Sequence, residues 1–209
     1  MSESNPTVSP DWPQRLLPER ALPPYSYVTG KFPHPVRDAA GHQFGQPDRV
    51  EDPLNPSEWR QSESYRFGID LFNQGYYWEA HESWEGCWHA VERTGAVGSF
   101  LKALIKLAAA GVKAREGRPA GVQRHGTRAR TLLLDLAISE PQDYAGLSLN
   151  RLIDLCDRLI ADPQKFVDIS NRPVVIVLPA LRVNERPIQG GAGPPRQERT
   201  RAPTDSEND

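Results

Sequence analysis

The residues best suited to chemistry lie in one stretch, Phe72 to His89, which holds three of the chain's five tryptophans and two of its five histidines. Within it His81 and Glu85 are four residues apart, so a helix would place both on one face. Imidazole and carboxylate groups are ligands for divalent metal ions and are also common general acids and bases. With Glu82 beside them, His81, Glu82 and Glu85 are the candidate catalytic residues.

The same stretch has the periodicity of a helix with one apolar stripe. That stripe consists of Tyr77, Ala80, Trp84, Cys87, Trp88 and Val91. Glu79 and Ser83 point the opposite way, whereas His81 and Glu85 lie along the edge of the stripe. Polar groups beside buried tryptophans are costly unless they are paired, ligated or used chemically. We therefore expect a pocket beside this helix, with Trp84 and Trp88 as its walls.

Other segments carry polar side chains that would have to be brought to this pocket. A lysine stripe runs along an otherwise apolar segment near residues 98–116, and two histidines lie in a proline-rich segment near the N-terminus. The candidate ligand-pocket residues are Trp84, Trp88, Lys102, Lys106, His125, His34 and His42. The lysine stripe is equally compatible with a line of side chains facing solvent.

The candidate metal ligands are His81, Glu85 and His125, for an unidentified divalent ion. His-Glu-x-x-Glu is similar to the zincin pattern His-Glu-x-x-His, with Glu85 in place of the second histidine. The structural alternative is a buried polar cluster in which His81 bonds a carboxylate and Glu85 pairs with Lys102 or Lys106. A site without metal, for binding or for acid–base chemistry, is a third interpretation.

The positions of the prolines divide the chain. Of the 20 prolines, 11 lie in residues 1–56 and only two in 57–162, so the middle is expected to be helical. Apolar periodicity and capping residues predict helices from Ser57 to Gly75, Tyr77 to Glu92, Gly98 to Glu116, Ala120 to Ile138, and Ser148 to Asp162. The sequence thus predicts an all-α domain, a single bundle of about five helices.

The flanking segments are expected to be extended or disordered. Residues 1–21 and 188–209 are polar and are predicted to be disordered. Residues 22–56 are predicted to form an extended arm across the bundle at 57–162. Within the extended segment 163–187, the β-branched run Val174–Leu178 could pair with the arm. The histidines of the arm, His34 and His42, raise the hypothesis of a lid that reaches His81, Glu85 or His125.

Composition makes several classes of function less favoured. The net charge of −2 and the pI near 6.2 do not favour binding to nucleic acid or to an anionic membrane. Cys87 and Cys156 fall on apolar helical faces and are expected to be core residues. No signal peptide or membrane span is recognised, and a cytoplasmic location is expected.

Three consecutive motifs resemble a known family. They are Asp70-Leu-Phe-Asn-x-Gly-x-Tyr-x-Glu-Ala-His-Glu-x-Trp-Glu-x-x-Trp88, then Phe100-Leu-Lys-x-Leu-Ile-x-Leu-Ala-Ala108, and Gly-x-x-x-His-x-x-Arg-Ala ending at Ala129. Together they resemble an uncharacterised bacterial and archaeal family, domain of unknown function 309, over about residues 60–135. The resemblance implies a small all-α bundle. It carries no established activity and therefore assigns no catalytic residue.

Two functional hypotheses follow from these patterns. One is a His/Glu/Trp pocket that binds a small molecule or performs acid–base or metal-assisted hydrolysis, with His81 or Glu85 as the base. The other is a helical adaptor that binds a protein partner without catalysis. The sequence leaves open whether the protein is an enzyme and what its ligand is.

Overall fold

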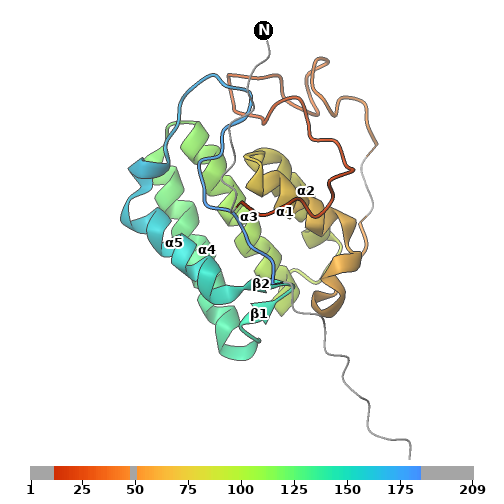
Figure 1. The fold of residues 1–209 in the computed structure, drawn as a ribbon, viewed down its shortest axis with the longest axis vertical. Coiled ribbons are helices and arrows are strands. Elements are labelled where there is room, and N and C mark those ends of the chain that lie inside the picture. Colours follow the sequence, from red (N-terminus) through yellow and green to blue (C-terminus); the bar gives the residue numbers. More distant parts are fainter. Residues whose placement is uncertain (1–11, 48–50, 185–209) are drawn as a thin grey trace, which may run out of the picture.

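A computed structural model describes residues 12–47 and 51–184 of the chain (Figure 1). Its five α-helices are α1 (Glu63–Asn73), α2 (Tyr77–His89), α3 (Ala96–Arg115), α4 (Pro119–Ser139) and α5 (Leu149–Ala161). Two short 3-10 helices are η1 (Pro56–Gln61) and η2 (Pro163–Phe166). A two-stranded antiparallel hairpin between α4 and α5 consists of β1 (Asp143–Tyr144) and β2 (Leu147–Ser148). The predicted all-α bundle is confirmed.

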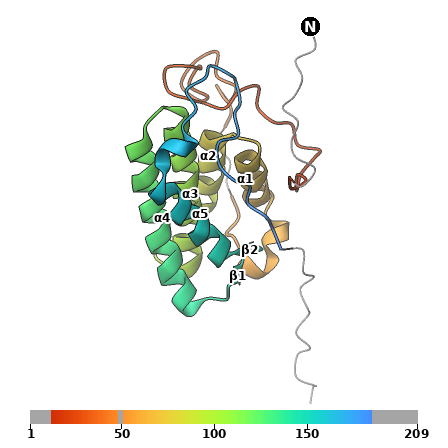
Figure 2. The ribbon, with the colours of Figure 1, turned by 60° about the vertical axis from the view of Figure 1, so that its left-hand side comes forward.

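Each helix packs against the next along the chain, and α3 lies between α2 and α4 (Figures 1 and 2). The position of α3 explains why its sequence is apolar nearly all round, since most of its surface contacts other helices. At Gly111 a β-carbon would lie 2.4 Å from the ring of Tyr77, so glycine is needed for α2 and α3 to approach this closely. Aromatic side chains fill the core, led by Tyr65, Phe72, Trp84 and Phe100.

Both cysteines belong to this core, as predicted. Cys87 of α2 and Cys156 of α5 have no exposed surface. Burial raises the pKa of each thiol to about 12, so neither ionises near neutral pH.

The first predicted helix is divided in two. Asn55 caps η1 by accepting a hydrogen bond from the backbone N–H of Ser57, and Ser62 then caps α1 by accepting one from the N–H of Tyr65. Two good capping residues lie seven positions apart, so the chain starts a helix twice. The end of α2 at His89, rather than Glu92, is a second difference from prediction.

Residues 12–21, which were predicted to be disordered, are held against the bundle. The main-chain N–H groups of Leu16 and Leu17 donate to the two carboxylate oxygens of Asp70 in α1, at 2.7 and 2.8 Å. Leu17 is buried against the bundle. The prediction of disorder is therefore wrong for residues 12–21, because a buried carboxylate on α1 satisfies their main chain. Residues 1–11 and 185–209 lie outside the described part of the chain.

The C-terminal flank turns once in η2 and then runs back across the bundle as an irregular segment to residue 184 (blue in Figures 1 and 2). The segment that was predicted to be extended from residue 163 begins instead with a 3-10 helix, η2. The C-terminal segment was also expected to pair with the arm. In the described residues one main-chain hydrogen bond joins the two, from Ser26 N–H to the carbonyl of Pro173. Val183 forms a single bridge with Leu147 of β2.

Candidate functional site

Three polar side chains of α2 converge on one face. His81 Nδ1 lies 3.3 Å from Glu82 Oε1 and 3.8 Å from Glu85 Oε2. One ligand atom from each residue lies within 4.8 Å of the other two. The side chains are 27–40% exposed, so solvent reaches them. We call these three residues the His81 cluster; no other such group of three His, Cys, Asp or Glu occurs in the described residues.

The lysine stripe of α3 borders this cluster. Burial lowers the pKa of Lys106, the charges of Arg128 and Lys102 lower it further, and the charge of Glu85 opposes them. Lys106 and Glu85 are therefore electrostatic neighbours across the α2–α3 contact. Within the stripe Lys106 is partly buried, whereas Lys102 is exposed to solvent.

The two tryptophans that were expected to be pocket walls have different environments. Trp84 is fully buried and donates its indole N–H to the carbonyl of Tyr65 at 3.2 Å, so it is a core residue and does not line the surface. Trp88 is half-buried, with the guanidinium of Arg93 and the ammonium of Lys102 at 4.8 and 5.9 Å from its ring centre. Its buried indole N–H has no hydrogen-bond partner in the described structure. Only Trp88 remains a candidate wall.

His125 of α4 is a second unpartnered group. Burial, followed by the charges of Lys106, Arg124, Lys113 and Arg128, lowers its pKa to about 4. Its buried Nδ1 bonds to no described residue. His125 was predicted to be the third metal ligand beside His81 and Glu85. In the structure the third member of that group is Glu82. His125 is therefore a neutral imidazole among cations.

The two histidines of the arm contact residues of α2 that are not in the His81 cluster. His42 Nε2 lies 3.3 Å from Glu79 Oε1, and both side chains are buried. His34 packs against Trp78 with ring centres 5.5 Å apart, and its Nδ1 accepts from two main-chain N–H groups of its own loop. Glu79 precedes His81 by two residues, which is about 200° around the helix. His42 is therefore bound on the side of α2 away from the His81 cluster. Trp78, the contact of His34, precedes His81 by three residues and lies about 60° from it around the helix, but the described hydrogen bonds of the His34 ring go to its own loop.

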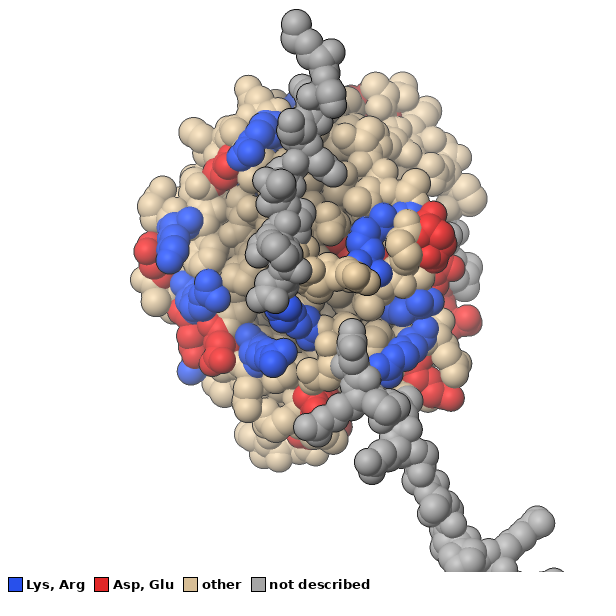
Figure 3. Space-filling model, viewed as in Figure 1, with Lys and Arg blue, Asp and Glu red and all other residues tan. Residues whose placement is uncertain are grey.

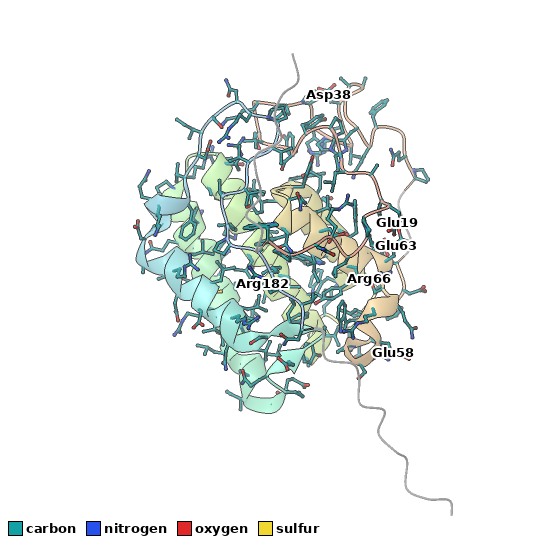
Figure 4. The ribbon with its side chains drawn as sticks, viewed as in Figure 1. Glu19, Asp38, Glu58, Glu63, Arg66 and Arg182 are labelled. Atoms are coloured by element: carbon teal, nitrogen blue, oxygen red, sulfur yellow. The ribbon has the colours of Figure 1, made fainter. Side chains whose placement is uncertain are left out.

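Sequence reasoning missed a set of buried polar residues whose partners are main-chain groups of the flanks. They are Asp70, Asn73, Glu79 and Arg115, together with the hydroxyl of Tyr77. Glu79, for example, accepts hydrogen bonds from Tyr27 N–H and Ser26 Oγ. Figure 4 shows the arm, with Asp38, at one end of the molecule and Glu58 of η1 near the other. The available signal was that four of these five lie within the first family motif, where Glu79 is off the apolar stripe.

Two surface clefts are lined by residues other than those of the His81 cluster. One of about 500 Å³ is lined by acidic residues around η1, and one of about 230 Å³ lies between α5 and the C-terminal segment. On the face shown in Figure 3, Lys and Arg side chains alternate with Asp and Glu over the described surface.

Comparison with known proteins gives one family. Residues 65–125 match the model of a family described as Domain of unknown function (DUF309), which confirms the resemblance seen in the sequence. The matched range contains Asp70, Asn73, Tyr77 and the whole His81 cluster. No curated protein matches the chain. Among the described helices, none combines the length and apolar character needed to cross a membrane.

Proposed function

We propose that the His81 cluster binds a divalent ion of the first transition row, and that this ion and Lys102 and Lys106 hold an anionic small molecule. The observation that carries the proposal is the convergence of one imidazole and two carboxylates within 4.8 Å. Ligand atoms about 2.1 Å from a tetrahedral ion lie about 3.4 Å apart. The separations of 3.3 and 3.8 Å from His81 Nδ1 are close to that spacing.

Three protein ligands are the usual number at a metal site that keeps a position open for water or substrate. A bound ion there would supply an activated water, so the site suits metal-assisted hydrolysis. The neighbouring ammonium groups favour a substrate with a carboxylate or phosphate group. The unpartnered indole N–H of Trp88 adds a donor beside Lys102.

The test uses full-length protein without an affinity tag. After incubation with Zn²⁺ or Mn²⁺ and gel filtration, we expect about one ion per chain by elemental mass spectrometry. His81→Ala and Glu85→Gln should each lower this value at least tenfold, because each removes one of three ligands. His89→Ala is the matched control, because His89 lies on the same helix but its Nδ1 contacts Arg93. Equal metal content in wild type and His81→Ala would end the proposal.

A second candidate function is the helical adaptor. It is favoured by a different observation, namely the buried side chains that bind main-chain groups of the flanks.

A further inference from the structure

The turn between α1 and α2 binds a segment of main chain. We call residues 173–183 the strap; it follows an exposed loop at Asn171 and Arg172. Asn73 makes two bonds with one residue of the strap, accepting from Leu181 N–H at 2.7 Å and donating to its carbonyl at 2.9 Å. The hydroxyl of Tyr77 accepts from the N–H groups of Val177 and Leu178, at 2.9 and 2.8 Å.

Gly75, midway between these two residues, lets the strap pass closely. Its φ of +86° is a conformation that other residues adopt only with strain, and a β-carbon there would lie 2.7 Å from the carbonyl oxygen of Val175. The alternate residues Asn73, Gly75 and Tyr77 therefore all contact the strap. We call these three residues the turn receptor.

The strap buries one side chain in three. Val175, Leu178 and Leu181 are buried, whereas the residues between them are partly exposed. A period of three is that of a polyproline II chain, which makes no internal hydrogen bonds and leaves its main chain free for a receptor. Figure 1 shows the strap crossing the bundle toward β2, and Figure 4 labels Arg182 near its end.

All four hydrogen bonds between the turn receptor and the strap involve main-chain groups of the strap. Such bonds do not depend on the identity of the bound side chains. The receptor lies inside the family-matched residues 65–125, and the strap lies outside them. The receptor and its occupant are thus separate parts of the chain, joined through α5 and the loop at 167–172.

We propose that the turn receptor is a docking site for extended polypeptide, and that the strap is an occupant that a partner can replace. The partner is a segment in extended conformation with apolar side chains at every third position. Its main chain would donate two successive N–H groups to Tyr77 and pair one residue with Asn73. This proposal does not rest on the metal site, because none of the four hydrogen bonds between the turn receptor and the strap involves His81, Glu82 or Glu85.

The test is strap exchange in the full chain. A protease site inserted between Asn171 and Arg172, both exposed, allows the strap to be cut from the bundle without removing it. A fluorescent peptide of residues 172–184 is then added, and bound label and released fragment are measured by gel filtration, with circular dichroism to monitor the bundle. We expect the peptide to replace the fragment while the helices remain folded. A peptide with Leu178→Asp and Leu181→Asp should bind at least tenfold more weakly.

Variants of the turn receptor test whether its hydrogen bonds to the strap are needed for peptide binding. Tyr77→Phe removes the acceptor of two N–H groups and should weaken peptide binding at least tenfold. Tyr76→Phe is the matched control, because the described hydrogen bonds of the strap involve Tyr77 and not its neighbour. If Tyr77→Phe does not fold, Asn73→Asp, which removes the donor to Leu181, gives the same readout.

Three results would overturn the proposal. The cut fragment could stay bound at every peptide concentration and leave only when the helices unfold. The bundle could unfold as soon as the strap is cut. Peptide binding could be equal in Tyr77→Phe and Tyr76→Phe. Each would mean that the strap is an inseparable part of the core.

Discussion

His42 Nε2 lies 3.3 Å from Glu79 Oε1 in the interface between the arm and α2. The same carboxylate accepts from Tyr27 N–H at 2.9 Å and from Ser26 Oγ at 3.2 Å. A charged group is costly to bury unless its hydrogen bonds are satisfied, and here one segment of arm supplies all three. Glu79 therefore anchors the arm on the bundle.

Glu79→Ala should lower the free energy of unfolding by about 2–4 kcal/mol, because it leaves Tyr27 N–H and Ser26 Oγ buried without an acceptor. Chemical denaturation measures the change. Glu82→Ala is the control, since the side chain of Glu82 is 40% exposed and should change stability by less than about 0.5 kcal/mol. Equal effects of the two substitutions would show that the arm is not anchored at Glu79.

The two tryptophans should differ in their contributions to stability. Trp84→Ala should cost about 3–5 kcal/mol, because it leaves a large cavity in the core and removes the bond to Tyr65. Trp88→Ala should cost about 1–2 kcal/mol, because the ring is half-exposed and its indole N–H has no described partner. Urea denaturation of both variants compares them, and a larger loss in Trp88→Ala would contradict these environments.

His125 should make stability depend on pH. Its pKa of about 4 in the folded state lies below the 6.5 of an unfolded chain, so the unfolded chain binds the proton more tightly. Its stabilisation is complete above pH 6.5 and is lost as the pH falls toward 4. At pH 5 the loss should be about 1–2 kcal/mol, allowing for partial exposure.

The variant His125→Gln isolates this effect. Between pH 7.5 and 5 the wild type should lose about 1–2 kcal/mol more stability than the variant, measured by denaturation at each pH. The comparison cancels other titrations, such as that of Asp70, whose pKa is raised by burial. Parallel pH profiles would show that His125 is as accessible in the folded chain as in the unfolded one.

Metal binding should appear in stability as well as in composition. At an ion concentration of 100 times Kd, a site present only in the folded chain adds about 2.7 kcal/mol. Glu82→Gln and Glu85→Gln should abolish this gain, yet without metal they should melt close to wild type, because both side chains are 40% exposed. Thermal melts with and without Zn²⁺ measure both effects. A large loss of stability without metal would instead identify structural ion pairs.

The helices were predictable because their apolar residues recur with the helical period. The cap at Ser148 and the core positions of Cys87 and Cys156 follow from local sequence, and the structure confirms them. The short hairpin at 143–148 was not predicted, because two strands of two residues carry no periodicity.

The environment of the polar residues on α2 was harder to predict. A helical pattern shows that Glu79 is off the apolar stripe, but it cannot show that the arm covers that side. His81 and Glu85 were recognised as neighbours from their spacing, because both lie on one helix. The residues expected from other segments, His34, His42 and His125, depended on long-range packing, and none of them joins the group of ligand atoms.

The two buried thiols provide a built-in measure of breathing motions. With no exposed surface and a pKa of about 12, Cys87 and Cys156 can react with a thiol reagent at neutral pH only when the surrounding helices separate. Cys87 lies on α2 and Cys156 on α5. The rates at which the two thiols are labelled therefore measure how often two different parts of the molecule open. Equal rates would mean that the bundle opens as one unit, and a faster rate at Cys156 would locate the weaker half at the C-terminal helices.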